Sequence, residues 1–180
     1  MKEDQILYKE FLKGNDKAFE IIMDKYMEKL IYFIQSFVKN IDVAEDLAQD
    51  VFVYILINKK DYDFKYSLKT YLFTIGKCRA FNYIKKEKRV IKLEESSYSN
   101  EEEIEDIVFK NEKYKNLKKS INKLNSSQSR VIFLADIEEL PYKDICKILD
   151  MSMAKVKTLI HRGRKNLKEI LLKEVDLYNG

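Results

Sequence analysis

Residues that interrupt helices are scarce in this chain of 180 residues, which has 4 glycines and 1 proline. Glycine and proline are the least favourable residues in a helix interior, so helices can form wherever apolar residues recur at helical spacing. The composition, with 46% hydrophobic and 36% charged residues, is that of a soluble globular protein. The sequence therefore predicts an all-α fold.

Cysteine and histidine are rarer still, and their positions do not indicate a metal or catalytic site. Cys78 and Cys146 are far apart, and neither has a second ligand at zinc-site spacing. We expect both to be buried, reduced thiols in a cytosolic protein. The single histidine has no nucleophile beside it, and no glycine-rich phosphate loop is present. An enzyme is therefore disfavoured, and no cofactor, metal or small-molecule substrate is expected.

Long apolar runs are missing as well. A membrane span needs about 20 apolar residues, and no stretch of the chain approaches that length. The N-terminal segment includes Lys2, Glu3, Asp4, Lys9 and Glu10, which excludes the apolar core of a signal peptide. We therefore expect a cytoplasmic protein.

Helical periodicity marks three segments in the first half of the chain. Apolar residues recur at three- and four-residue steps over 17–39, 42–58 and 68–88, whereas 59–67 has no clean period and is predicted to be a loop. Asp16 is the predicted cap of the first helix. The buried stripe expected on the second helix consists of Val43, Leu47, Val51 and Tyr54.

An acidic stretch separates this half from the next. Residues 94–106 contain acidic but no basic residues, and such a segment buries too little apolar surface to offset its chain entropy. We predict two small helical domains, 1–92 and 109–180, joined by a flexible acidic linker, 93–108. Helices of the second domain are predicted at 109–124, 127–138, 142–149 and 152–173. The apolar run 131–135 also fits a buried strand, but no partner strand is visible, so it is interpreted as helix.

The second domain contains the pattern of a helix-turn-helix. Pro141 suits the first turn of a helix, and Asp150 to Ser152 form a tight connection that ends in a capping serine. The following helix has an apolar stripe made of Val156, Ile160, Gly163, Leu167, Ile170 and Leu171. Its opposite face carries small, polar and basic residues, namely Ala154, Lys155, Lys157, Thr158, His161, Arg162, Lys165 and Lys168.

That face has the chemistry of a recognition helix. Small and hydrogen-bonding side chains can enter the major groove, while lysine and arginine hold phosphates. The alternative is a solvated basic face, which is what most charged helix faces are. The short turn, the cap and the one-sided cations occur together, which favours DNA binding. His161 is interpreted as a groove contact or as a merely exposed histidine.

The net charge of +4 is small, but the charges are segregated between two helices of the first domain. Residues 71–89 mix aromatic and basic side chains, which suits capture of single-stranded nucleic acid, although Phe73 and Phe81 are expected to be core. The helix 42–58 instead has an acidic-polar face with Asp42, Glu45, Asp46, Gln49 and Asp50. Such a face suits docking on a basic protein surface, although plain solvation also explains it.

These segments resemble the extracytoplasmic-function (ECF) sigma factors, the small two-domain initiation subunits of bacterial RNA polymerase. The resemblance rests on GNDKAFEIIMDKY, VAEDLAQDVF, SLKTYLFTIGKCRAFNYIKKEKR and LNSSQSRVIFLADIEELPYKDICKILDMSMAKVKTLIHRGRKNLKE, in that order. It implies a protein that binds core RNA polymerase and promoter DNA and directs transcription initiation. It also implies a membrane-linked anti-sigma factor as a partner.

The resemblance further implies roles for individual residues. Core-polymerase binding falls to Asp46, Gln49 and Asp50. Melting of the minus-10 element and capture of a flipped base fall to Tyr62, Phe64, Arg79, Asn82, Lys85 and Lys86. Reading of the minus-35 element falls to Lys155, Lys157, Thr158, His161, Arg162 and Lys165. The linker would thread toward the active channel of the polymerase.

The sequence departs from the family pattern at five positions. The family usually has Trp at Tyr71, Asn at Cys78, Asp at Asn82, Gly at Asp150 and Arg at Leu159. None of these changes breaks the helical periodicity. The changes at 78 and 82 leave the detail of the minus-10 contacts open, and the change at 159 removes one cation from the DNA-facing helix.

Two other classes of protein fit part of the sequence. An ordinary helix-turn-helix transcriptional regulator explains the second domain but gives no purpose to the acidic helix and the aromatic-basic helix of the first. A helical adaptor with no DNA role is the other alternative, and it leaves the one-sided cations unexplained.

Overall fold

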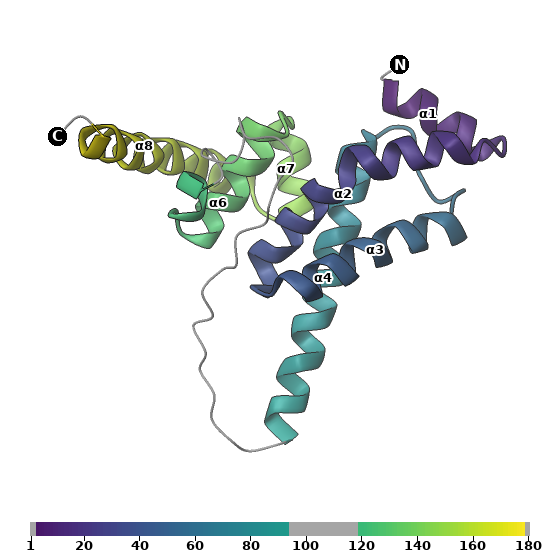
Figure 1. Ribbon diagram of the computed structural model, residues 1–180, viewed down its shortest axis with the longest axis horizontal. Coiled ribbons are helices and arrows are strands. Elements are labelled where there is room, and N and C mark those ends of the chain that lie inside the picture. The colour runs from purple at the N-terminus through teal and green to yellow at the C-terminus, as the bar shows by residue number, and fades with distance from the viewer. Residues whose placement is uncertain (1–2, 94–118, 179–180) are drawn as a thin grey trace. The chain divides into compact units, whose positions relative to one another are not determined.

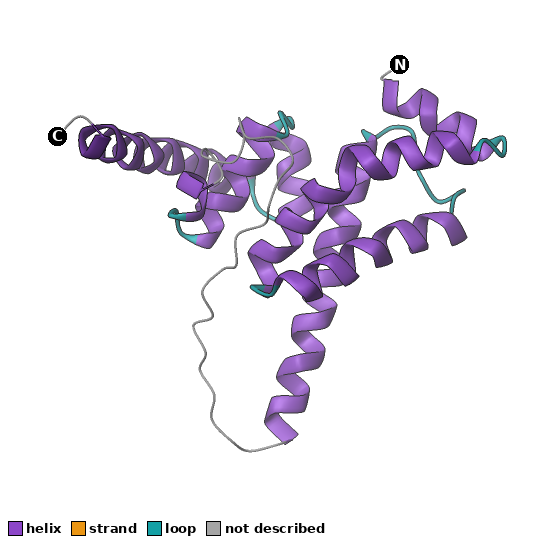
Figure 2. Ribbon diagram, viewed as in Figure 1, coloured by secondary structure: helices purple, strands orange, loops and turns teal. Residues whose placement is uncertain are grey.

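The computed structural model describes residues 3–93 and 119–178 (Figure 1). The chain forms two compact units, 1–107 and 108–180. Both units are built from helices and loops, and the described ranges contain no strand (Figure 2). The all-α prediction is therefore confirmed. Beyond residue 93 the predicted linker lies outside the described residues. No helix in the described part of the chain is long and apolar enough to cross a membrane.

Within residues 3–93 the first unit has four helices, α1 (Glu3–Leu12), α2 (Asp16–Val38), α3 (Ile41–Ile57) and α4 (Leu68–Leu93). The last three agree with the predicted helices, and α4 extends five residues further than predicted. Helix α1 was not anticipated. A helix this short is marginal on its own, and its buried residues are only Tyr8 and Phe11. It is stabilised by packing, since Phe11 stacks on Phe19 of α2 with ring centroids 4.6 Å apart.

A tight turn of two residues, Lys39 and Asn40, joins α2 and α3 into a helical hairpin. Lys39 adopts the left-handed conformation with φ 63° and ends α2. Asn40 begins α3, because its side-chain oxygen accepts a hydrogen bond from the Val43 amide at 2.9 Å. At the start of α2 the capping position is Asn15, without a side-chain cap hydrogen bond, so the prediction of Asp16 as the cap is wrong by one residue.

Small residues determine which side of α3 is buried. The buried positions are Ala44, Ala48, Val51, Phe52 and Ile55, whereas three residues of the predicted stripe, Val43, Leu47 and Tyr54, are only half-buried. The predicted stripe followed the large apolar side chains. In the fold the alanines face inward, because a side chain of one methyl group lets neighbouring helices approach closely. The stripe prediction was therefore displaced by about 90°, a quarter of a helical turn.

The core of the first unit is rich in aromatic rings. Phe33 and Phe73 are fully buried, and their rings meet edge to face at 5.1 Å. Phe73 is core as predicted. Phe81 is not, since it is 51% exposed, with its ring 5.5 Å from that of Phe37 and 5.3 Å from the Lys77 ammonium. The reason is its place on α4, where the C-terminal half of the helix extends beyond α2 and α3 (Figure 1).

The described part of the second unit begins with helical residues 119–122. Four elements follow: α6 (Ser126–Ile132), the π-helical turn η1 (Phe133–Ile137), α7 (Tyr142–Leu149) and α8 (Met153–Tyr178). The helical interpretation of the run 131–135 is confirmed. The part of the predicted helix 109–124 that precedes residue 119 lies outside the described residues.

The π turn solves a packing problem that an α-helix does not. Four consecutive residues, Val131 to Leu134, are at most 1% exposed, whereas one side of a regular α-helix holds only every third or fourth residue. In η1 the Glu138 amide donates to the Phe133 carbonyl at 3.0 Å, five residues back, which widens the helix. The segment packs against both α7 and α8, so all four side chains are covered.

Gly163 lets α8 lie directly on α6. A Cβ atom added at this position would be 2.7 Å from Cγ1 of Ile132 and 3.1 Å from its Cδ1, well inside van der Waals contact. The glycine lies on the predicted packing stripe of α8, and the close approach of the two helices requires it.

We expect Gly163→Ala to destabilise the protein by about 1–3 kcal/mol, the usual cost of overpacking, although alanine is the better helix former by about 1 kcal/mol. Chemical denaturation measures the free energy of unfolding. In an Ile132→Ala background, which removes both clashing atoms, the same substitution should become neutral or stabilising. An equal cost in the two backgrounds would contradict the proposed clash.

Candidate nucleic-acid and protein-binding surfaces

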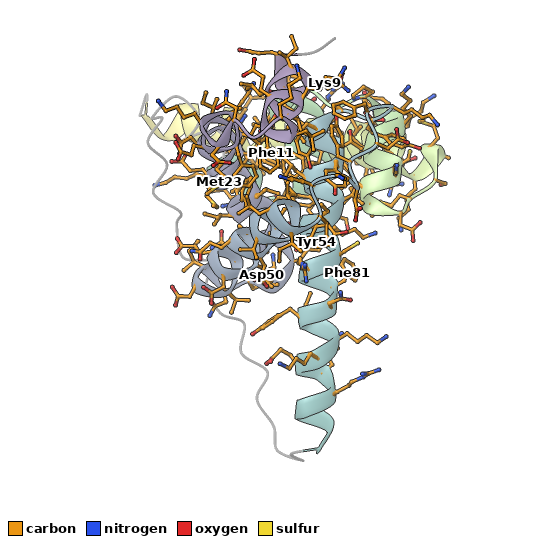
Figure 3. All side chains as sticks on the ribbon, turned by 90° about the vertical axis from the view of Figure 1, so that its right-hand side faces the viewer. Lys9, Phe11, Met23, Asp50, Tyr54 and Phe81 are labelled. Carbon is orange, nitrogen blue, oxygen red and sulfur yellow. The ribbon has the colours of Figure 1, made fainter. Side chains whose placement is uncertain are left out.

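Helix α3 presents one continuous exposed face. Its first half is acidic and polar, and all three predicted core-binding residues, Asp46, Gln49 and Asp50, are exposed there. Asp50 is labelled on the surface of the unit in Figure 3. At 100° per residue the same face continues into the second half of the helix. We call this whole surface, from Asp42 to Ile57, the α3 face.

The second half of the α3 face is apolar, which the sequence analysis missed. Val53, Leu56 and Ile57 are 51%, 47% and 75% exposed. Exposed apolar side chains that adjoin one another on a helix mark an interaction surface more often than scattered ones do. The sequence did contain a signal for this apolar surface. The three- and four-residue spacing of the acidic residues, continued for two more helical turns, leads to Val53, Leu56 and Ile57.

The loop between α3 and α4, residues 58–67, contains Tyr62 and Phe64 and is built around a cluster of rings. Tyr62 is central, with ring centroids 4.7 Å from Tyr8, 4.6 Å from Phe64 and 5.1 Å from Tyr71. It is only 5% exposed, and its hydroxyl donates to the Tyr66 carbonyl at 2.7 Å. Phe64 is half-buried and reaches the surface. The structure therefore makes Phe64 accessible, while Tyr62 supports the loop from inside.

Helix α1 contacts this loop through several side chains. The Gln5 amide donates to the carbonyls of Phe64 and Tyr66 at 2.9 and 3.1 Å. The Tyr8 hydroxyl donates to the Lys59 carbonyl at 3.0 Å. The Lys9 ammonium, on the residue labelled in Figure 3, lies 5.3 Å from the centroid of the Phe64 ring, at the distance of a cation–π contact.

Burial of the ring cluster changes the acidity of its phenols. Burial raises the pKa of Tyr8 and Tyr62 above the ordinary value, and it raises the pKa of Tyr71 to about 12. The Tyr71 hydroxyl is buried and has no hydrogen-bond partner among the described residues. This is the position at which the family usually has Trp, a residue without a hydroxyl.

The remaining predicted minus-10 residues lie along α4. Asn82, Lys85 and Lys86 are exposed, and the Arg79 guanidinium lies 5.4 Å from the centroid of the Tyr54 ring of α3. At 1.5 Å per residue, the interval from 68 to 85 corresponds to about 25 Å along the helix. Arg79 already lies about 16 Å along the helix from its start beside the loop, so these residues and the loop form an extended surface and not one compact cluster.

The two cysteines are more accessible than predicted. Cys78 is exposed and Cys146 is half-buried, and both are free thiols. Cys78 lies on the side of α4 opposite Leu72, Gly76 and Ala80, which are buried. The prediction of buried thiols was wrong because it used the general preference of cysteine for the interior and ignored helix phase.

In the second unit α7, a turn and α8 form the predicted helix-turn-helix. Asp150 ends α7 in the left-handed conformation with φ 54°, which explains why the family usually has glycine there. The Ser152 hydroxyl accepts a hydrogen bond from the Lys155 amide at 3.3 Å and caps α8. The six residues predicted to read the minus-35 element are all exposed on α8, and they are Lys155, Lys157, Thr158, His161, Arg162 and Lys165.

The packing side of α8 is shorter than the predicted stripe. Val156, Ile160 and Gly163 are buried, whereas Leu167 and Ile170 are half-buried. The first half of the helix is thus held against the unit, and the second half extends from it.

An ion pair that sequence reasoning missed also holds α8. Arg164 donates from Nε and Nη2 to both carboxylate oxygens of Asp136, at 3.1 and 2.6 Å. These hydrogen bonds raise the pKa of Arg164. The Asn166 amide adds a bond to the Gln128 side chain at 3.1 Å. Asp136 belongs to η1, so the spacing along the sequence gave no signal for this pair.

The comparisons with known proteins agree with both units. The family described as Sigma-70 region 2 matches residues 22–90, and Sigma-70, region 4 matches residues 114–167. The ECF RNA polymerase sigma factor SigW of Bacillus subtilis is 30% identical over 175 residues, which cover 91% of this chain and 94% of SigW. The chain belongs to the ECF RNA polymerase sigma factors. As a sigma factor it is not an enzyme: it binds core polymerase and promoter DNA and directs transcription initiation.

Two further relatives are similar to this sigma factor over most of its length. The RNA polymerase sigma factor YlaC of Bacillus subtilis is 28% identical over 167 residues, covering 90% of this chain and 96% of YlaC. The fold is similar to that of the sigma factor RpoE of Bartonella quintana, solved in complex with the anti-sigma factor NepR, with a TM-score of 0.67 and 24% identity. That match covers 86% of this chain and 97% of RpoE. An ordinary helix-turn-helix regulator is not favoured, because the region 2 match covers most of the first unit.

The buried tyrosines predict a fall in stability at alkaline pH. In the unfolded chain their pKa is about 10, whereas Tyr8, Tyr62 and Tyr71 hold their protons to higher pH when folded. Their contribution is therefore complete below about pH 10 and is lost as the pH rises through the folded-state values. We expect the free energy of unfolding to decrease between about pH 10 and pH 12, measured by denaturation at fixed pH.

Tyr71→Phe is the matched variant for this effect. It should remove one late step from the titration of phenolate absorbance, and at neutral pH it should not lower stability, because it deletes a buried hydroxyl that lacks a partner among the described residues. A titration curve identical to that of the unchanged protein would contradict the prediction.

Proposed function

We propose that the two units divide the work of initiation between three surfaces. The first domain, 1–92, binds core polymerase through the α3 face and captures the minus-10 element through the loop 58–67 and α4. The second domain, 109–180, reads the minus-35 element through α8, and 93–108 links the two. The observation that carries this division is the segregation of exposed charge: acidic on α3, basic on the outer sides of α4 and α8.

Core binding is assigned to Asp46, Gln49 and Asp50. Exposed carboxylates on one helix side steer a basic partner into place and set its orientation. Val53, Leu56 and Ile57 supply the apolar area that such an interface needs at its centre. An acidic face also repels DNA, which keeps the docking surface separate from the nucleic-acid surfaces.

Capture of the minus-10 element is assigned to Phe64, Arg79, Asn82, Lys85 and Lys86, with Tyr62 as the buried support of the loop. Unpaired bases stack on aromatic rings for about 1–3 kcal/mol each, and cations beside the rings follow the phosphates. We call residues 58–67 the minus-10 loop. Its accessible ring, Phe64, precedes the start of α4 at Leu68, and the exposed cations Lys85 and Lys86 lie further along that helix.

Reading of the minus-35 element is assigned to the exposed residues of α8, and these are Lys155, Lys157, Thr158, His161, Arg162 and Lys165. Arginine and lysine bond guanine edges in the major groove or hold phosphates, and threonine and histidine can contact base edges. Arg164 is left out of this set, since Asp136 holds its guanidinium.

An anti-sigma factor is proposed as a further partner, and the cytoplasm, where core polymerase works, as the location. The supporting observations are the solved relatives: RpoE is bound to the anti-sigma factor NepR, and CnrH is bound to the cytosolic domain of CnrY. A membrane-linked anti-sigma factor is the form of partner proposed for this chain.

Run-off transcription with purified core polymerase tests the core-binding assignment. The double change Asp46→Lys and Asp50→Lys should abolish core association in a pull-down and the transcript with it, because it places like charges against a basic partner. DNA affinity of the full chain and its helicity should not fall. The double change Glu20→Lys and Asp24→Lys is the control, because it alters charge equally at the same four-residue spacing on exposed positions of α2. If the double variant at 46 and 50 still binds core polymerase in the pull-down, the α3 face is not part of the interface.

Footprinting on a promoter tests the assignment of α8. Arg162→Ala or Lys165→Ala should weaken binding by about 1–3 kcal/mol where the side chain reads a base, and by less where it holds a phosphate. Loss of a phosphate contact also lowers the dependence of affinity on salt. Lys173→Ala, at an exposed position further along the same helix, is the control. Footprints of unchanged strength would exclude the two residues from the DNA surface.

A further inference from the structure

The backbone hydrogen bonds within the minus-10 loop join residues that are close in sequence. Within the loop the Asp61 amide donates to the Asn58 carbonyl at 2.9 Å and the Tyr66 amide donates to the Asp63 carbonyl at 3.1 Å. These bonds close short turns. They do not determine where the loop lies relative to the helices, so contacts from another element must do so.

Helix α1 supplies those contacts from one side. Gln5, Tyr8 and Lys9 stand at spacings of three and four residues, which places them on the same side of a helix. The Gln5 amide nitrogen lies within hydrogen-bond distance of three acceptors in the loop: the carbonyls of Phe64 and Tyr66 at 2.9 and 3.1 Å, and the Tyr62 hydroxyl at 3.3 Å. An amide nitrogen has two hydrogens to donate. Both are used by the loop, across about 60 residues of sequence.

Helix α1 is itself held against α2, so it can transmit a position. The Tyr26 hydroxyl donates to the Asp4 carboxylate at 2.6 Å, and Phe11 stacks on Phe19. Phe19 in turn meets Phe52 of α3 with ring centroids 6.0 Å apart. Through α1 and α2, the loop is therefore positioned relative to α3, the helix that carries the α3 face.

We propose that Gln5 is a positioning residue for minus-10 recognition: by tying the Phe64 and Tyr66 carbonyls to α1, it places the Phe64 ring where the loop selects an unpaired base. The proposal rests on the proposed function of the minus-10 loop. Gln5 touches no base in it; it acts through the loop. Its loss changes which base is selected, whereas core binding and minus-35 reading stay as they are.

The test uses the full chain with core polymerase on templates in which the minus-10 and minus-35 elements are both randomised. Sequencing of the transcribed templates gives the base preference at each position. Gln5→Met keeps the length of the side chain and removes its donors. It should lower the preference at one or more minus-10 positions by about fivefold. Preferences at the minus-35 element should be unchanged.

Three variants make the result decisive. Ile6→Met introduces the same residue at the neighbouring, 45% exposed position of α1 and should leave both preferences intact. Gln5→Glu, nearly identical in shape and without donors, should reproduce the change, and it replaces Gln5→Met if circular dichroism shows that the latter loses helicity. Phe64→Ala reports on the loop itself.

The outcomes separate the two claims. A changed minus-10 preference in Phe64→Ala with an unchanged one in both Gln5 variants overturns the role of Gln5 and leaves that of the loop. Unchanged preference in Phe64→Ala and in both Gln5 variants overturns the proposed function of the loop, and the role of Gln5 with it. A lower yield of transcript with both preferences intact shows a structural role only and also overturns the proposal.

Discussion

The packing of α3 through Ala44 and Ala48 is the constraint on which the first unit depends. With alanine inward, the helix sits close to its neighbours, and its outward side is left to carboxylates and then to Val53, Leu56 and Ile57. A larger residue at either alanine would separate the helices and move the α3 face relative to the rest of the unit. The position of the proposed core-binding face therefore depends on residues that never reach the surface.

The second unit solves the same problem with a glycine and an ion pair. Gly163 brings α8 onto Ile132, and Arg164 bonds both oxygens of Asp136. Partly exposed ion pairs contribute little to stability, but a bidentate pair restricts rotation of the helix about its axis. Rotation decides which side chains of α8 can reach a groove, so this pair bears on orientation more than on stability.

Helix positions were predictable because apolar spacing and scarce breakers are local properties. The helices 17–39, 42–58 and 142–149 agree with the structure to within a residue. Predictions of burial were wrong where they depended on the side of the helix that a residue occupies or on how far the helix extends past its neighbours. Phe81 and Cys78 were expected inside and lie exposed. Phe81 is exposed because the end of α4 extends past its neighbours, and Cys78 is exposed because it lies on the side of α4 opposite the buried residues. Helix α1 was missed because two buried rings in ten residues give no period.

The sequence by itself determined the helical class, the positions of most helices, the segregation of charge and the family, since each is carried by residue order along the chain. Only the tertiary structure decided that Tyr62 supports the loop from inside, that Gln5 holds the loop across about 60 residues, and that Arg164 belongs to Asp136. The physical reason is distance in sequence: periodicity reports which side of a helix is apolar, but it carries no information on which remote carbonyl or carboxylate that side will meet.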